Sequence, residues 1–348
     1  MRKTLALALA ALLLVSASGR ALAATTLLET GSSLLYPLMN LWVAAYQESN
    51  KDVQITTSST GSGTGISQAI AGVAQIGASD AFMADAQMKG TPMLNIPLAI
   101  SAQQINYNVP GLNTVHLNLS GPVLAGIYGG TIQYWDDAKI KDINKPYAGK
   151  LPHQPIVPIR RADSSGDTFI FTQYLTKSTP SWANGPGYGT IVNWPSVATA
   201  VGAQGNAGMV QTCQNTQYSI AYIGVAYIEQ TDKAGLGYAA LQNQGGKFVL
   251  PTPKNIAAAA AVTDKATPSD ERISLIYGQG EDSYPIINYE YAIVNPKQSD
   301  SAKAAEVRKF LDWALTEGQN AGFLDKVHFL PLPPSVLKLS RSQVAKIV

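Results

Sequence analysis

Three short polar clusters of the sequence carry the residue types that bind an oxyanion. They are residues 31–34, 60–65 and 160–168, and each one precedes an apolar stretch with helical spacing. A helix start offers free N–H groups and a partial positive charge, while Ser and Thr add hydroxyl donors. For any single cluster the ordinary alternative is a helix cap or a turn, since Ser, Thr, Asp and Gly are common there.

Arg161 and Asp163 form the informative pair within the third cluster. An Arg side chain offers a planar fork of donors to an oxyanion, and a carboxylate two positions later could orient that fork. The alternative is a surface ion pair, and the adjoining Ser165 and Gly166 argue against it.

Asp80 and Asp167 are unexpected in such a setting, because a carboxylate repels a bound anion. They make chemical sense if the anion keeps a proton to donate, as phosphate does near neutral pH and sulfate does not. A buried acceptor left unpaired would reject the fully ionised anion, because a lost hydrogen bond adds to the repulsion. Two such acceptors imply a ligand with two O–H groups, or one aspartate that is itself protonated.

The sequence lacks the residues that nucleotide-binding and metal-binding sites require. The run 60–65 is not followed by Lys-Ser or Lys-Thr, so it is not a phosphate loop of the Walker A type, and its spacing is wrong for a dinucleotide fingerprint. Cys213 is the only cysteine, which excludes a disulfide within the chain and a cysteine metal cluster. His116, His153 and His328 are far apart, so we expect no zinc site, no other metal and no cofactor.

The segments around the polar clusters alternate between strand and helix patterns. Strand-like stretches at 53–56 and 76–78 alternate with helical spacing after residues 33 and 65, and the run 60–65 is predicted to be a turn. This alternation indicates an α/β fold. Two further strand-like segments, 104–109 and 286–294, share the sequence Ile-Asn-Tyr about 180 residues apart. Crossing strands that carry the chain into a second lobe and back would have this pattern.

The first 23 residues are typical of a secretory signal peptide. Arg2 and Lys3 precede an apolar run over 5–15, and Ala-Leu-Ala at 21–23 is a cleavage site, which predicts a mature start at Ala24. The run is shorter than the roughly 20 residues of a bilayer span, although an anchor helix is the alternative. No Cys lies at the cleavage point, so we expect a periplasmic protein without a lipid anchor.

The charge balance changes when this segment is removed. The full chain of 348 residues has 25 basic and 23 acidic residues, a net charge of +2. The signal segment holds three of the basic residues and no acid, which leaves 22 against 23, a net charge of −1. Nucleic-acid binding therefore has no electrostatic support.

Four motifs in order identify a family. They are GSSLLYP at 31–37, GASDA at 77–81, RADSSGDTF at 161–169 and YPIINYEY at 284–291. With them the mature chain resembles, over essentially its whole length, the phosphate-binding proteins of bacterial phosphate-specific ABC transporters. The resemblance implies the two-lobed α/β fold of periplasmic solute-binding proteins, with a ligand cleft between lobes joined by crossing strands. We expect residues 24–108 and 287–348 in the first lobe and 109–286 in the second.

The resemblance also implies a set of ligand contacts. The phosphate-binding residues would be Ser32, Ser33, Leu34, Ser62, Asp80, Arg161, Ser165, Gly166 and Asp167, with Asp163 orienting Arg161. Many members of the family have Thr where this chain has Asp167, which leaves open the number of donors and the preferred charge of the phosphate.

The expected function is capture of inorganic phosphate in the periplasm, without catalysis, by a monomer that delivers it to an inner-membrane permease and its ATPase. One alternative is a secreted phosphatase with Ser165 or Ser33 as nucleophile, although no His base or metal cluster has suitable spacing. Another is a binding protein for sulfate, molybdate or a different oxyanion, which Asp80 and Asp167 disfavour.

Overall fold

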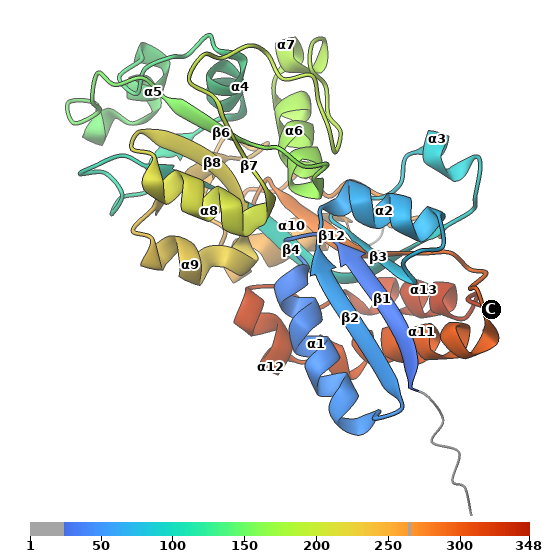
Figure 1. Ribbon diagram of the computed structural model, residues 1–348. Helices are drawn as coiled ribbons and strands as arrows, with labels where there is room; N and C mark the ends of the chain where they lie inside the picture. The colour runs from blue at the N-terminus through green and yellow to red at the C-terminus, as the bar shows by residue number, and fades with distance from the viewer. Residues whose placement is uncertain (1–23, 264–265) are drawn as a thin grey trace, which may run out of the picture.

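A sheet of nine strands passes through both lobes of the molecule (Figure 1). The computed structural model describes residues 24–263 and 266–348, and the expected signal peptide at 1–23 lies outside the described residues. The strands follow one another across the sheet in the order β2-β1-β3-β12-β4-β8-β6-β7, with β9 paired to β4.

The first lobe begins with alternating strands and helices, as the sequence predicts. The parallel strands are β1 (Thr25–Gly31), β2 (Val53–Ser59) and β3 (Ile76–Ser79), and the helices between them are α1 (Tyr36–Ser49) and α2 (Ser62–Ile70). Helix α1 buries Leu38 and Trp42 on the sheet side, which its helical spacing predicts. The prediction of a turn over the whole run 60–65 is wrong, because α2 already begins at Ser62.

Two antiparallel strands cross between the lobes, β4 (Leu94–Asn108) and β12 (Ile287–Val294). Residues 94–102 of β4 pair with β12, and residues 103–108 pair with β8 (Ser219–Gly224) of the second lobe. The expected pair of crossing strands is confirmed, although the first of them is much longer than the predicted 104–109. Every residue of β12 is buried, as is usual for a strand covered on both faces.

The second lobe continues the sheet and adds a smaller one. Its strands are β8, β6 (Val157–Arg161), β7 (Val201–Ala203) and β9 (Gly237–Tyr238), and the smaller sheet holds β5 (Asn118–Leu119), β10 (Ala240–Gln242) and β11 (Phe248–Val249). Its helices are α4 (Gly121–Gly129), α5 (Ala138–Ile143), α6 (Gly166–Ser178), α7 (Pro180–Ala183), α8 (Gly205–Asn215), α9 (Ile228–Lys233) and α10 (Pro253–Thr263).

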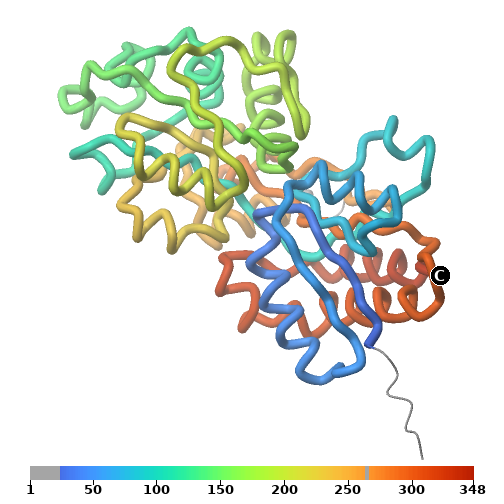
Figure 2. The backbone as a smooth tube through the Cα atoms, in the orientation of Figure 1, coloured from blue at the N-terminus to red at the C-terminus, as the bar shows by residue number. Residues whose placement is uncertain are grey.

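The C-terminal part of the chain returns to the first lobe. After β12 it adds α11 (Ser301–Ala314), α12 (Ala321–Leu324) and α13 (Pro334–Val344), and α11 packs against β1 and α1 while α13 packs against β4. The red C-terminal helices therefore lie beside the blue N-terminal strands, and the green and yellow middle of the chain forms the other lobe (Figure 2). The short helix α3 (Asp85–Met88) and four 3-10 turns, Lys145–Tyr147, Val225–Tyr227, Glu317–Gln319 and Asp325–Val327, complete the described elements.

Candidate functional site

Loops from both lobes meet at the carboxyl ends of their parallel strands. In the first lobe residues 32–34 follow β1, Ser62 opens α2 and Asp80 follows β3; in the second Arg161 ends β6 and residues 163–166 lead into α6. Ligands of open α/β sheets bind at this edge, outside the carboxyl ends of the strands. The sequence-predicted site residues of both lobes are thus brought together at one place between them.

The Asp80 carboxyl group is held by two serine hydroxyls of its own lobe. Ser32 Oγ donates to Asp80 Oδ1, and Ser62 Oγ donates to Asp80 Oδ2 at 3.3 Å. Ser32 Oγ in turn accepts the backbone N–H groups of Leu34 at 3.0 Å and Leu35 at 2.9 Å. Ser32 and the Leu34 N–H, both predicted as ligand donors, therefore support Asp80 in this structure.

Arg161 is clamped by two carboxylates of its own lobe. Its Nε donates to Asp163 Oδ1 at 2.7 Å, and its terminal nitrogens donate to Asp163 Oδ2 and to Asp167 Oδ2, each at 2.5 Å. The Arg161 side chain is 1% exposed, so this is a buried, forked ion pair and not a surface pair. Three of the five guanidinium N–H groups are used in this way, which leaves two for a ligand.

The start of α6 supplies further donors. The N-cap residue Ser165 accepts the Thr168 N–H through its hydroxyl at 3.3 Å, and its own N–H donates to the Thr190 carbonyl at 2.9 Å. Within the described chain, the N–H groups of Gly166 and Asp167 donate to no other group. They open a helix of 13 residues and are buried, so they are ready to bind a negative charge.

Four carboxyl groups and one guanidinium share this site. Burial, and then the negative charges of Glu290 and Asp167, raise the pKa of Asp80 well above its usual range. Burial also raises the pKa of Asp167, although the charge of Arg161 offsets part of the effect. For Asp163 the hydrogen bonds and charge of Arg161 outweigh burial and lower the pKa. The site therefore tends to hold protons, which relieves the repulsion that four carboxylates would create.

The two lobes touch each other directly at the site. Asn206 Nδ2, at the start of α8, donates to Ser33 Oγ at 2.8 Å and to Asp167 Oδ2 at 2.7 Å. A Cβ atom added to Gly166 would lie 2.4 Å from Asp80 Oδ2, so only a glycine fits there. The cavity that borders Asp80 measures about 10 Å³, which is typical of closely packed surfaces.

Sequence reasoning missed three buried polar residues. Gln103 Nε2 donates to Asp167 Oδ1 at 3.1 Å, and Asn206 bridges the lobes through its bond to Ser33 Oγ. Glu290 lies fully buried on β12, where its Oε1 accepts the Ser101 hydroxyl at 2.5 Å and the Asn288 amide at 3.1 Å. Glu290 did have a sequence signal, because it is the one charged residue in the strand-like segment 286–294. Gln103 and Asn206 had none.

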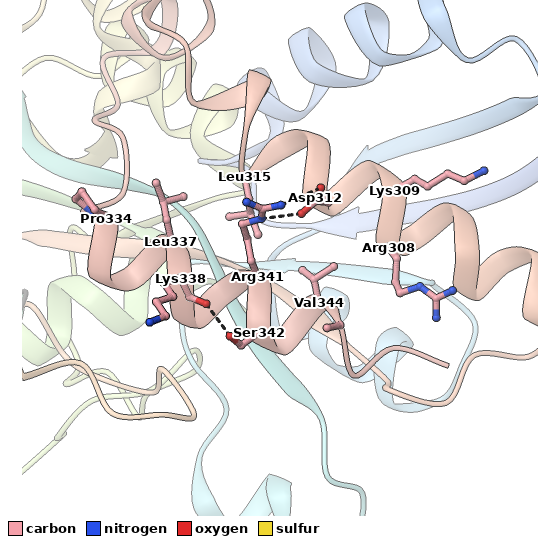
Figure 3. A pocket seen from close by; sticks show the side chains of 11 residues that line it. Arg308, Lys309, Asp312, Leu315, Pro334, Leu337, Lys338, Arg341, Ser342 and Val344 are labelled. Atoms are coloured by element: carbon pink, nitrogen blue, oxygen red, sulfur yellow. Dashed lines mark hydrogen bonds and ion pairs between the residues drawn. The ribbon is translucent and has the colours of Figure 1, made fainter.

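A larger groove lies elsewhere on the first lobe. It measures about 850 Å³ and runs between α11 and α13, with Arg308, Lys309, Lys338 and Arg341 along it (Figure 3). Arg341 is paired with Asp312 at 2.8 Å. None of the predicted site residues lines this groove, so volume alone does not locate the anion site.

The described residues contain neither a membrane-spanning helix nor a metal cluster. No helix in residues 24–263 or 266–348 is long and apolar enough to cross a membrane. In the same part of the chain, no group of three or more His, Cys, Asp or Glu side chains has an arrangement that could hold a metal ion.

Comparison with known proteins gives consistent matches. Residues 16–317 match the sequence profile of the PBP superfamily domain. The phosphate-binding protein PstS of Methanocaldococcus jannaschii is 34% identical over 336 residues, which cover 91% of this chain and 85% of that protein. PstS of Haemophilus influenzae is 32% identical over 320 residues and 92% of each chain. The solved structure of a high affinity periplasmic phosphate-binding protein, PfluDING, bound with phosphate, has a TM-score of 0.72 at 19% identity, over 91% of this chain and 93% of that one.

A two-lobed α/β fold with convergent donors between its lobes defines a solute-binding protein, which confirms the expected fold class. Within that class the chain belongs to the family of PstS phosphate-binding proteins. The resemblance carried by the four sequence motifs is thereby confirmed.

Proposed function

We propose that this protein binds inorganic phosphate between its lobes as the solute-binding subunit of a phosphate ABC importer. One observation carries the proposal: the buried Arg161 guanidinium and the free N–H groups at the start of α6 lie beside the carboxyl groups of Asp80 and Asp167. The donors alone would suit any oxyanion. The carboxyl acceptors suit an oxyanion that still carries a proton, as phosphate does. The PstS relatives are named phosphate-binding proteins, which supports the same ligand.

The donors have distinct roles in this proposal. Arg161 supplies charge and two N–H groups, with Asp163 holding its fork in place. The free N–H groups of Gly166 and Asp167 bind a second face of the anion. We assign phosphate contact to Ser32, Ser33, Leu34, Ser62, Asp80, Arg161, Ser165, Gly166 and Asp167. For Ser32, Leu34 and Ser62 this requires that the donors now directed at Asp80 and at Ser32 turn to the anion when it binds.

The acceptors set the selectivity. A phosphate O–H can donate to Asp80 or Asp167, whereas fully ionised sulfate has no proton for either carboxylate. Each acceptor left unpaired would cost about 1–3 kcal/mol, before the repulsion between like charges is added. Because every 1.4 kcal/mol is tenfold in affinity, two such acceptors predict that phosphate binds at least about thirtyfold more tightly than sulfate.

Closure of the lobes links capture to delivery. We propose that residues 24–108 and 287–348 move as one lobe and residues 109–286 as the other, with β4 and β12 bending between them. The contacts of Asn206 with Ser33 and of Gly63 N–H with the Ser164 carbonyl, at 3.0 Å, are of the kind that form on closing. The closed monomer would then dock on an inner-membrane permease with its ATPase, in the periplasm, where the signal peptide predicted for 1–23 would direct it.

We propose no catalysis for this site. Activation of Ser33 or Ser165 as a phosphatase nucleophile would need an adjacent base. His116 is hydrogen-bonded to the Tyr238 carbonyl and His153 to Asp136, both away from the site.

Calorimetric titration with phosphate and with sulfate tests the proposal. The wild-type protein should give tight binding of phosphate and no measurable heat with sulfate. Asp80→Asn removes the acceptor charge, so it should weaken phosphate and allow sulfate to bind, while the surface control Asp136→Asn should change neither. Equal binding of both anions by the wild-type protein would overturn the proposal.

A further inference from the structure

Gln103 is a buried polar residue of β4 at the point where this crossing strand passes from one lobe to the other. Residues 94–102 of β4 pair with β12, and Gln103 opens the stretch that pairs with β8, opposite Gly224. The Gln103 N–H donates to the Ile286 carbonyl at 3.1 Å, and the Gln103 carbonyl accepts the Tyr284 hydroxyl at 2.8 Å. The main chain of Gln103 is therefore held by the segment that leads into β12 as well as by β8.

The face of β4 that holds Gln103 also supports the first-lobe side of the site. Ser101 lies two residues earlier, on the same face of the strand. Its hydroxyl donates to Asn288 Oδ1 at 2.7 Å, and Asn288 Nδ2 donates to the Asp80 carbonyl at 3.3 Å. One polar face of the crossing strands thus lies beneath both Asp80 and Asp167.

The side-chain amide of Gln103 is directed at one residue of the anion site. Its Nε2 donates to the main-chain carbonyl and to Oδ1 of Asp167, each at 3.1 Å. Within the described residues Gln103 is the one donor to Oδ1, whereas Oδ2 accepts Arg161 at 2.5 Å and Asn206 at 2.7 Å. Because β4 holds one oxygen while β6 and α8 hold the other, the plane of the Asp167 carboxyl group is fixed.

Packing alone does not account for a glutamine at this place. The side chain is 0% exposed, and its Oε1 is buried with no donor among the described residues. An unpaired buried acceptor costs free energy, and an apolar side chain of the same length would avoid that cost. What the amide adds is its nitrogen, which holds the Asp167 carboxyl group and the first turn of α6.

We propose that Gln103 is a positioning residue for the anion: it ties the start of α6 to the crossing strand and holds the Asp167 carboxyl group in its acceptor orientation. The inference rests on the proposed function, in which Asp167 offers phosphate both an acceptor and a free N–H. In this role Gln103 acts through Asp167 and makes no contact with the anion. Without the amide, the carboxyl group could rotate, and its ordering would then oppose binding.

A double-mutant cycle with Asp167 tests the inference. Gln103→Met replaces the amide by an apolar group of similar length, and we expect it to weaken phosphate binding about tenfold, because one hydrogen bond to a charged acceptor is lost. In Asp167→Ala the carboxyl group is already absent, so Gln103→Met should then change the phosphate affinity less than about twofold. Equal weakening in both backgrounds, or none in the wild-type background, would overturn the inference.

Gln104→Met is the matched control. Gln104 is the next residue of β4, it is also buried, and its Oε1 likewise has no donor among the described residues. Its Nε2 donates to Thr231 Oγ1 at 3.1 Å, in α9. The control should leave the phosphate affinity within about twofold of the wild-type value in both backgrounds. A tenfold loss in Gln104→Met as well would reveal a general effect of strand packing and would overturn the inference.

Affinities too weak for calorimetry can be measured by thermal unfolding in phosphate up to about 100 mM, because a ligand of the folded state raises the melting temperature. If Gln103→Met does not fold, Gln103→Asn takes its place with the same expected coupling, since its amide is one methylene shorter and falls short of Asp167. A wild-type protein that binds no phosphate overturns the proposed function and this inference with it. Tight phosphate binding without the coupling overturns the role of Gln103 alone.

Discussion

Gly166→Ala should abolish tight phosphate binding without harming the fold. Gly166 is the first residue of α6, and its φ is not in the positive range, so an alanine fits the backbone of the second lobe. The added Cβ atom would lie 2.4 Å from Asp80 Oδ2 and 2.4 Å from Ser62 Oγ, both of which belong to the first lobe. The substitution therefore obstructs the contact between the lobes and leaves each lobe intact.

The structure gives the size of the effect. An ordinary contact of a Cβ atom begins near 3.4 Å, so the lobes must separate by about 1 Å at this point. That displacement lengthens the bond from Asn206 Nδ2 to Ser33 Oγ from 2.8 Å to roughly 3.8 Å, which is beyond hydrogen-bond distance. Loss of two or three such contacts, at about 1–1.5 kcal/mol each, costs about 2–4.5 kcal/mol and weakens binding by roughly 30-fold to 1500-fold.

The assay is calorimetric titration with phosphate, together with thermal unfolding of the phosphate-free protein. Alanine is a better helix former than glycine, by about 0.5–1 kcal/mol in a helix interior, so the phosphate-free variant should melt no earlier than the wild-type protein. Gly129→Ala is the matched control, because it lies in α4 and a Cβ atom there meets nothing within 4 Å. Phosphate affinity of Gly166→Ala within threefold of the wild-type value would refute the reasoning.

Three further predictions follow from the buried polar groups. Arg161→Leu leaves the buried Asp167 and the partly buried Asp163 without their cation, so the free energy of unfolding in urea should fall by about 3–5 kcal/mol; an unchanged midpoint would contradict this. Burial raises the pKa of Glu29 from 4.5 to about 8, so the folded state binds the extra proton between these values and the free energy of unfolding should fall as the pH rises from about 5 to 8. Glu29→Gln should make that decline shallower, and an equal slope in both proteins would count against it. Asn206→Ala removes the donor to Ser33 and Asp167 and should weaken phosphate binding about tenfold by calorimetry, whereas unaltered affinity would show that this bridge is dispensable.

The elements around the site could be predicted because they depend on local sequence. Strand ends and helix starts have characteristic residues, so residues 31–34 and 160–168 are found where the motifs place them. The crossing strands were recognisable from their shared pattern. The early part of β4 was not, because Pro97 and the buried polar residues Ser101 and Gln103 interrupt the apolar pattern of a central strand.

The contacts between distant segments could not be predicted from the sequence. Asn288 Nδ2 links Glu290 to Asp80, 210 positions apart, by donating to Glu290 Oε1 at 3.1 Å and to the Asp80 carbonyl at 3.3 Å. This link exists because β3, β12 and β4 are neighbours in one sheet. Asn206 enters the site because Gly205 adopts a φ of 62°, which turns the start of α8 towards Ser33. Neither the register of a sheet nor the meeting of two lobes is encoded in a local pattern.

The most direct test of the central claim is a crystal structure of the protein grown with phosphate. We expect a tetrahedral anion between the lobes, bound by the Arg161 guanidinium and by the N–H groups of Gly166 and Asp167, with one phosphate oxygen within hydrogen-bond distance of Asp80. An anion located elsewhere, for example in the basic groove between α11 and α13, with the lobe interface unoccupied would contradict it.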